Sequence, residues 1–149
     1  MTIKDVERLL PNQRITAIGK AADMMWLAMG NDYEWYDELK KMYKKRSEYA
    51  LHLQCPWRIT RNSDIIVASF DFYVEYDDKT LFDLKIPELN KYFAENEVIV
   101  TGVETDVFGD LRVITNTDII LEVFANSSYK REFWRLLTPG EHIVVFEEE

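Results

Sequence analysis

Cysteine and histidine are scarce in this chain, and their scarcity excludes several kinds of site. The 149 residues include one cysteine and two histidines. A single cysteine forms no internal disulfide, and it suits a reducing compartment. A zinc site needs about four ligands, and the chain has neither an HExxH nor a CxxC motif. We therefore expect no disulfide, no metal site and no cofactor.

Glycine is also sparse, and the five glycines occur singly. The chain has no GxGxxG or Walker motif, so it lacks the phosphate-binding loops of ATPases, GTPases, kinases and Rossmann dehydrogenases. No serine is flanked by glycines in a GxSxG pattern, which argues against a serine nucleophile. We predict no catalytic residue from these patterns.

Basic residues are outnumbered by acidic ones, 18 against 27, and the net charge is −9. Such a chain repels a phosphate backbone, so we expect no nucleic-acid binding. An acidic surface suits a basic protein partner, and solubility alone explains it equally well. The chain has no run of about 18 apolar residues, and its charged N-terminal segment is unlike a secretory signal. We expect a cytoplasmic protein without a membrane segment.

The chain is rich in apolar residues, at 47%, and in aromatic residues, at 13%. This composition supports a hydrophobic core and argues against disorder. No repeat or Gly/Ser/Pro-rich linker divides the sequence. We predict a single domain over residues 1–149.

The first third of the chain contains helical and strand patterns. Residues 2–10 begin with a capping-box pattern and predict a helix. Residues 14–31 predict two strands around a break at Gly19-Lys20, the second one closed by Gly30-Asn31.

Residues 33–49 carry the most regular helical pattern. Acidic side chains come first and basic side chains come last, which complements a helix dipole. The segment holds the only basic cluster of the chain, and we interpret it as the solvated side of a helix. Its apolar stripe consists of Trp35, Tyr36, Leu39, Met42 and Tyr43.

From residue 48 the apolar period changes to two, which predicts strands. The remaining elements are expected at these positions: strands over 48–55, 57–60 and 65–76, a helix over 80–96 in two pieces with Pro87 starting the second, a three-strand meander over 98–125, a helix over 127–137, and a strand over 142–146. The sum predicts an α+β fold of mostly antiparallel sheet with meander hairpins, about seven or eight strands and three or four short helices packed on it.

The stretch ALHLQCPWRI, residues 50–59, places a histidine three residues before the cysteine. On a strand these side chains point to opposite faces, so His52 and Cys55 do not form a metal or nucleophilic pair. Cys55 shares the alternation of the leucines, which predicts a buried, inert thiol. The other face is either solvated, covered by a helix, or a site for a ligand or partner. The candidate binding residues are His52, Gln54, Trp57, Arg58, Trp134 and Arg135.

Two further clusters have plain structural explanations. Residues 126–128, Asn-Ser-Ser, are good helix N-caps before an apolar run, and the glycosylation sequon they form matters only in a secreted protein. Asp71, Glu75 and Asp77 share one face of the expected long strand. Their spacing lies within the range of a glycosidase carboxylate pair, and a wet strand face or a charged edge explains it equally.

Residues 49–59 (YALHLQCPWRI), 121–128 (LEVFANSS) and 133–137 (FWRLL) resemble a family of small bacterial proteins without an assigned function. Those sequences carry an LHxQCPWR block and, far downstream, LEVFxxSS and a Trp-Arg pair. The resemblance implies no catalytic residue and no cofactor.

We expect a non-enzymatic binding or interaction module. One version neutralises a basic protein partner, as an immunity protein does. The alternative is a small-molecule-binding protein or a weakly recognisable hydrolase with a pocket near His52 and Arg58. A homo-oligomer with a structural role is a third possibility.

Overall fold

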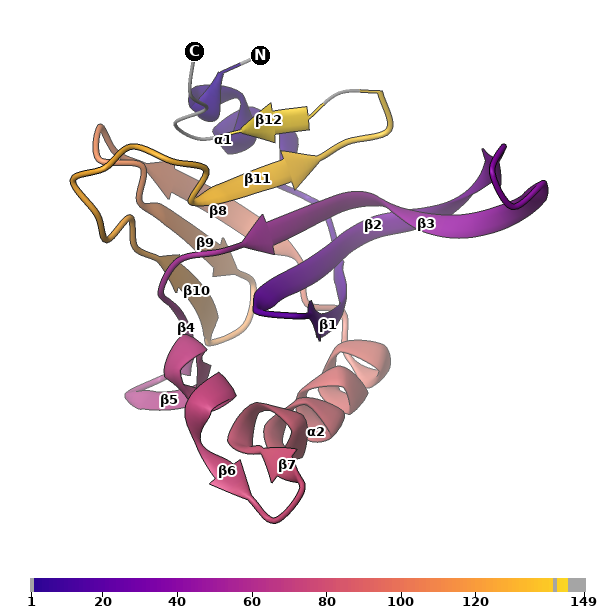
Figure 1. Cartoon of the computed structure of the whole chain (residues 1–149). Helices are drawn as coiled ribbons and strands as arrows, with labels where there is room; N and C mark the ends of the chain where they lie inside the picture. The colour runs from indigo at the N-terminus through magenta and orange to yellow at the C-terminus, as the bar shows by residue number, and fades with distance from the viewer. Residues whose placement is uncertain (1, 141, 145–149) are drawn as a thin grey trace.

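The strands of the chain form two five-stranded antiparallel sheets that face each other (Figure 1). The structure is a computed structural model that describes residues 2–140 and 142–144. In both sheets buried apolar residues alternate with more exposed ones, because successive side chains of a strand point to opposite faces.

The first sheet has the order β1-β2-β3-β11-β12. Its two longest strands, β2 and β3, continue past their neighbours as a hairpin that projects from the body of the molecule (Figure 1). The strands are β1 (Ile15–Ala21), β2 (Met24–Asp37), β3 (Met42–Leu53), β11 (Trp134–Leu137) and β12 (His142–Val144).

The second sheet has the order β5-β4-β10-β9-β8 and contains the predicted meander. A separate two-stranded sheet, β6 (Glu75–Tyr76) with β7 (Lys79–Thr80), forms a small hairpin beyond β5. The strands of the second sheet are β4 (Trp57–Arg61), β5 (Asp64–Ala68), β8 (Val100–Thr105), β9 (Leu111–Thr115) and β10 (Ile119–Val123).

The hydrophobic core lies between the inner faces of the two sheets. Leu51 and Leu53 of β3 and Trp134 of β11 are buried from the first sheet. Trp57 and Ile59 of β4 are buried from the second sheet. The short segment between β3 and β4 therefore carries the chain from one sheet to the other while the same alternation continues.

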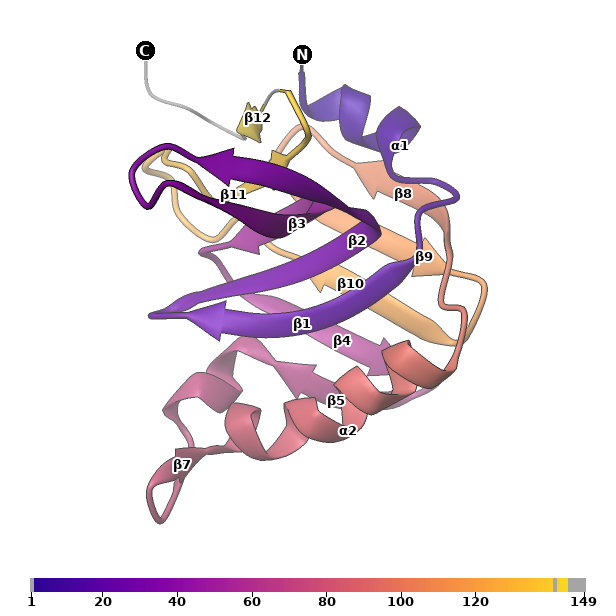
Figure 2. The same ribbon diagram turned by 90° about the vertical axis from the view of Figure 1, so that its right-hand side faces the viewer.

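Two α-helices lie in the described part of the chain and flank the sheets (Figure 2). The 3-10 turn η1 (Ile3–Asp5) and α1 (Val6–Leu9) lie beside β8. The longer α2 (Leu81–Glu95) lies along β1 and β5 (Figure 2). Its Asn90 completes the edge of β1, since the Ile18 N–H donates to Asn90 Oδ1 (2.8 Å) and Asn90 Nδ2 donates to the Ile18 carbonyl (2.9 Å). These bonds close an edge that would otherwise remain open for pairing.

The helix predicted over residues 33–49 is wrong, because this segment forms the hairpin of β2 and β3. Its charge pattern suits both structures. Early acidic and late basic residues complement a helix dipole, and in a hairpin they face each other across strands, as Glu34 does Lys45. The neighbouring residues decide the outcome: Met25 to Met29 already pair with Tyr49 to Leu53, which forces the segment between them to turn back.

The helix predicted over residues 127–137 is also wrong. Residues 124–133 are irregular apart from a bend, and β11 follows with Trp134 and Leu136 buried in strict alternation. Ser127 accepts a hydrogen bond at Oγ from the Tyr129 N–H (3.1 Å), so it forms a turn and not a helix cap. The prediction failed because an apolar cluster of this length fits either periodicity.

Three further boundaries differ from the predictions. The long strand over 65–76 ends at β5 and becomes the 3-10 turn η2 (Ser69–Tyr73), whose Asp71 accepts from the Ala68 N–H (2.9 Å). α2 is one helix with Pro87 inside it. The first hairpin turns at residues 22–23 and not at Gly19-Lys20; a Cβ at Gly19 would overlap the ring of Trp26.

The coarser predictions are confirmed. The fold is α+β and mostly antiparallel sheet, although the described residues form two α-helices and not three or four. The capping box of Thr2 and Asp5, the strand before Pro56 and the meander lie where predicted. The predicted terminal strand is present over His142–Val144, and residues 145–146 lie outside the described part. No described helix has the length and apolar character required to cross a membrane.

Candidate functional site: a basic depression on the first sheet

His52 and Arg135 are cross-strand neighbours on the outer face of the first sheet. The register pairs His52 of β3 with Arg135 of β11 on one side and with Trp26 of β2 on the other. An Arg135 terminal nitrogen lies 3.4 Å from His52 Nδ1. Since arginine is only a donor, His52 Nδ1 is the acceptor in this contact. Arg135 therefore helps to hold the His52 ring on the outer face of the sheet.

Arg135 is held by a second contact, to Glu132. Their Nε and Oε1 atoms are 3.4 Å apart, which places the charges together. Both atoms are buried, yet neither has a hydrogen-bond partner of acceptable geometry among the described residues. The ion pair therefore neutralises part of the charge of Arg135 and leaves its Nε–H unsatisfied.

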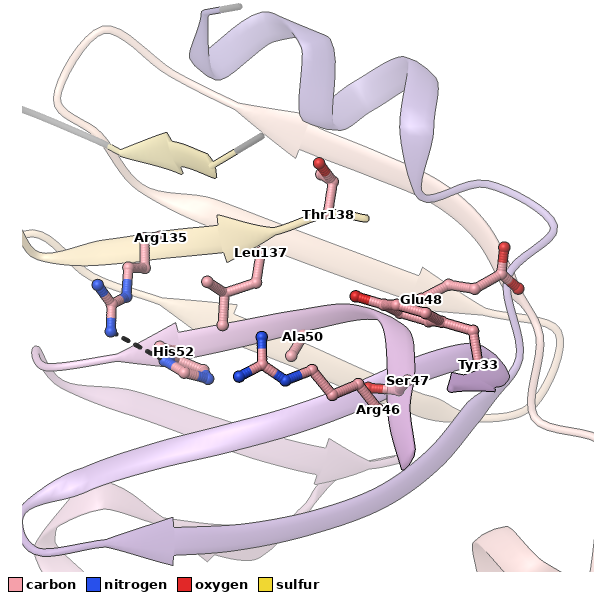
Figure 3. A pocket seen from close by; sticks show the side chains of 9 residues that line it. All are labelled: Tyr33, Arg46, Ser47, Glu48, Ala50, His52, Arg135, Leu137 and Thr138. Carbon is pink, nitrogen blue, oxygen red and sulfur yellow. Dashed lines mark hydrogen bonds between the residues drawn. The ribbon is translucent and has the colours of Figure 1, made fainter. Parts of the chain in front are cut away.

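Arg46 approaches the same place from the projecting hairpin. Its guanidinium carbon lies 3.6 Å from the centre of the Trp35 ring, a close stacking contact. Stacking uses the face of the guanidinium and leaves its in-plane N–H groups available for a ligand. In Figure 3 the His52 ring lies between the guanidinium groups of Arg46 and Arg135.

These side chains line a depression of about 450 Å³. Its floor is formed by the small Ala50, and the Tyr33 ring extends across β3 with its hydroxyl directed toward β11 (Figure 3). The carboxylate of Glu48 is held away from the arginines, because Oε1 accepts from the Asn31 N–H (2.7 Å). The described residues that line it are Tyr33, Arg46, Ser47, Glu48, Ala50, His52, Arg135, Leu137 and Thr138.

Hydrogen-bond donors dominate the middle of this depression. Two guanidinium groups and an imidazole ring meet there, and the tyrosine, serine and threonine hydroxyls add donors or acceptors at its margin. Charged donors in this arrangement suit a carboxylate or a phosphate group. No nucleophile lies among the lining residues beyond ordinary hydroxyls.

Arg58 does not belong to this site. It lies on β4, and its side chain is on the outer face of the second sheet, where Nε donates to Glu122 Oε1 (3.0 Å). The guanidinium also lies 5.5 Å from the ring centre of Phe124. Because the two sheets face each other, His52 and Arg58 point to opposite sides of the molecule. The structure brings together only His52 and Arg135 of the predicted set.

The other predicted site residues are elsewhere. Trp57 and Trp134 are buried in the core, and the indole N–H of Trp134 donates to the Gly109 carbonyl (2.8 Å). Gln54 is exposed beyond the end of β3. Sequence reasoning missed Tyr33 and Arg46, because both fall in or next to the segment assigned to a helix. Extending the alternation of His52 backwards through Ala50 and residue 48 would have reached Arg46.

Cys55 is buried, as predicted, and burial raises the pKa of its thiol to about 12. The thiol therefore stays protonated near neutral pH and is a poor nucleophile. The described residues contain no group of three or more histidine, cysteine, aspartate or glutamate side chains placed to hold a metal.

No protein-family model, curated protein or solved structure matches this chain.

Proposed function

We propose that the protein is a non-enzymatic binding module and that the basic depression accepts an anionic group of a small molecule. The observation that supports this proposal is the meeting of Arg46, His52 and Arg135 in a chain of net charge −9. Exposed cations cost little when scattered over a surface. Cations gathered around a concave site repel one another, and a bound anion relieves that repulsion.

The size and lining of the site suit a small ligand. A volume of about 450 Å³ lies within the range of small-molecule sites. Leu137 and Ala50 give the depression an apolar part beside its charged groups. A cytoplasmic location is part of this proposal and is supported by the single, buried cysteine. The resemblance to a bacterial family without an assigned function is compatible with a binding role.

Thermal-shift measurements and calorimetry with inorganic phosphate, citrate and neutral glycerol would test the proposal. A ligand that binds only the native state raises the melting temperature. We expect a rise with an anion and none with glycerol. Arg135→Ala and Arg46→Ala should each weaken binding about tenfold or more, because charged hydrogen bonds contribute about 1.5–3 kcal/mol.

Arg58→Ala is the matched control, since it removes the same group from the opposite side of the molecule. It should leave anion binding unchanged. Equal loss in Arg58→Ala and Arg135→Ala, or no binding of any anion by the wild-type chain, would contradict the proposal.

A second candidate function is recognition of a basic protein partner. Its support is an exposed group of rings, Phe70, Tyr73 and Tyr76, in a part of the chain that carries no lysine or arginine from residue 62 to residue 78. Exposed aromatic residues are typical of protein interfaces, and acidic neighbours favour a basic partner. Capture of a lysate protein at low salt, its release at high salt and its loss in Tyr73→Ala would support this function.

A further inference from the structure

Among the described residues, no other strand pairs with the outer part of the projecting hairpin. β1 pairs with β2 only as far as Met29, and β11 pairs with β3 only as far as Ala50. Beyond these positions β2 and β3 pair only with each other, and we call residues 31–48 the arm. The arm extends away from both sheets (Figure 1). Two-stranded ribbons of this kind are marginally stable in water, so the arm needs its own internal support.

That internal support is present. The rings of Tyr36 and Tyr43 form a cross-strand pair with centres 5.1 Å apart. At the turn, Asp37 Oδ1 accepts from the N–H groups of Leu39 (3.0 Å) and Lys40 (3.2 Å). Oδ2 of the same carboxylate lies 3.3 Å from Lys44 Nζ. The arm is thus ordered before it meets a partner, which lowers the entropic cost of binding.

The tip of the arm exposes apolar surface. Leu39 is 97% exposed and Tyr43 is 68% exposed, and Met42 and Tyr36 lie beside them. Within residues 37–46, which form this tip, five cationic residues at 40, 41 and 44–46 accompany two acidic ones at 37 and 38, whereas the base of the arm adds three acidic residues at 32, 34 and 48. An apolar surface with a basic rim on a projecting element is typical of an interaction site.

The same chain carries a surface of the opposite charge. Phe70 is 71% exposed and Tyr73 is 69% exposed, and their ring centres are 6.0 Å apart. Residues 62–78, which we call the aromatic segment, hold five carboxylates and no lysine or arginine. In Figures 1 and 2 the aromatic segment and the arm lie at opposite ends of the molecule, so one chain does not join them within itself.

We propose that the arm of one copy docks on the aromatic segment of a second copy. This inference deepens the second candidate function, on which it rests, by naming the basic partner. Apolar side chains meet apolar side chains, and the rim charges are opposite in sign. The contact is heterologous, since two different surfaces meet, and it leads to a ring or an open chain of copies.

Charge reversal gives a direct test. Lys40→Glu with Lys41→Glu makes the tip of the arm acidic, and Glu75→Lys with Asp78→Lys leaves three carboxylates against two lysines in the aromatic segment, which removes most of its negative charge. None of the ion pairs formed within the described part of the chain involves these four side chains. Mass would be measured by light scattering and sedimentation over a range of protein concentrations at low salt.

We expect the wild-type mass to rise with concentration and to fall with added salt. Each variant alone should associate at least tenfold more weakly, because the first carries negative charge on both surfaces and the second loses most of the negative charge of its aromatic segment. An equal mixture of the two variants should regain association, since each supplies the surface that the other lacks.

Lys4→Glu with Arg8→Glu is the control, because it makes the same charge change on η1 and α1, away from both surfaces (Figure 1). Circular dichroism would confirm folding of every variant, and Leu39→Ser tests the apolar tip without a charge change. A wild-type chain that stays monomeric overturns the inference. The inference also fails if the charge substitutions leave association unchanged, or if the mixture of the two variants does not regain it.

The second candidate function has a separate outcome. If a monomeric wild-type chain captures a basic lysate protein and Glu75→Lys with Asp78→Lys loses it, a foreign partner occupies the aromatic segment. That result overturns self-association and leaves the second candidate function standing. If neither association nor capture occurs, both fail.

Discussion

The outer faces of the two sheets carry arginine side chains in different surroundings. On the second sheet a row crosses four strands in register: Arg58, Glu122, Arg112 and Glu104. Opposite charges alternate along this row, with Arg58 3.0 Å from Glu122 and Arg112 3.6 Å from Glu104. On the first sheet Arg135 faces a histidine across the strand, and Arg46 stacks on a tryptophan.

This contrast distinguishes arginines whose charge is paired within the sheet from arginines whose charge is available to a ligand. On the second sheet every arginine of the row has a carboxylate from a neighbouring strand, so the sheet satisfies its own charges. On the first sheet Glu132 is the only carboxylate within ion-pair distance of Arg46 or Arg135 among the described residues. The same residue type therefore supports the sheet on one side and prepares a site on the other.

The largest expected effect separates the inner face from the outer faces. Trp134 and Arg135 are adjacent on β11, and only Trp134 is buried in the core. Trp134→Ala should lower the free energy of unfolding by about 3–5 kcal/mol, because it leaves a cavity and an unpaired Gly109 carbonyl. Urea denaturation measures this change.

Arg135→Ala is the control for that measurement, with an expected change within about 0.5–1 kcal/mol. Equal destabilisation by the two substitutions would contradict the assignment of Trp134 to the core and of Arg135 to the outer face.

A smaller effect is expected from the charge row of the second sheet. Glu122→Lys places three cations side by side, since Arg58 and Arg112 flank that position. We expect a loss of about 1–2 kcal/mol in the free energy of unfolding at low salt, reduced by added salt. Arg46→Glu on the first sheet should cost less, and the reverse ranking would contradict the assigned roles.

The smallest effect concerns the turn of the arm and depends on pH. The pKa of Asp37 is lowered, first by the hydrogen bond from the Lys40 backbone N–H and further by Lys44. A lowered native pKa means that the carboxylate supports the turn at neutral pH and that this support is lost as the pH falls through the native value, below about 4. Amide signals of Leu39 and Lys40 should shift in that range, and Asp37→Asn should remove the dependence. A turn that titrates near neutral pH would contradict this account.

Part of the fold followed from local pattern. The meander of β8, β9 and β10 alternates clearly and has short turns, and the strand that ends before Pro56 is equally regular. The hairpin structure of the arm could not be predicted from its local sequence, because its pattern of charged and apolar residues fits a helix and a hairpin equally well. Only the pairing of the residues before it with those after it chooses between them.

The candidate site was half predicted for a related reason. The alternation of β3 gave His52 its outward position, and the register with β11 added Arg135. Arg58 follows the same alternation and still points the opposite way. The chain crosses from one sheet to the facing one at residues 54–56. The buried side chains before and after this crossing point into the same core, whereas the outward side chains point to opposite sides of the molecule.

By itself, the sequence determined which side chains turn toward the core: Cys55 with Leu51 and Leu53, and His52 away from them. The hydrophobic effect favours burial of apolar side chains, and the alternation of apolar and polar residues along the sequence shows which face of a strand is buried. Only the tertiary structure decided which outward residues meet. Strand register brought Arg135 to His52, and the extension of β2 and β3 brought Arg46 to the same depression, through contacts between segments that lie far apart in the sequence.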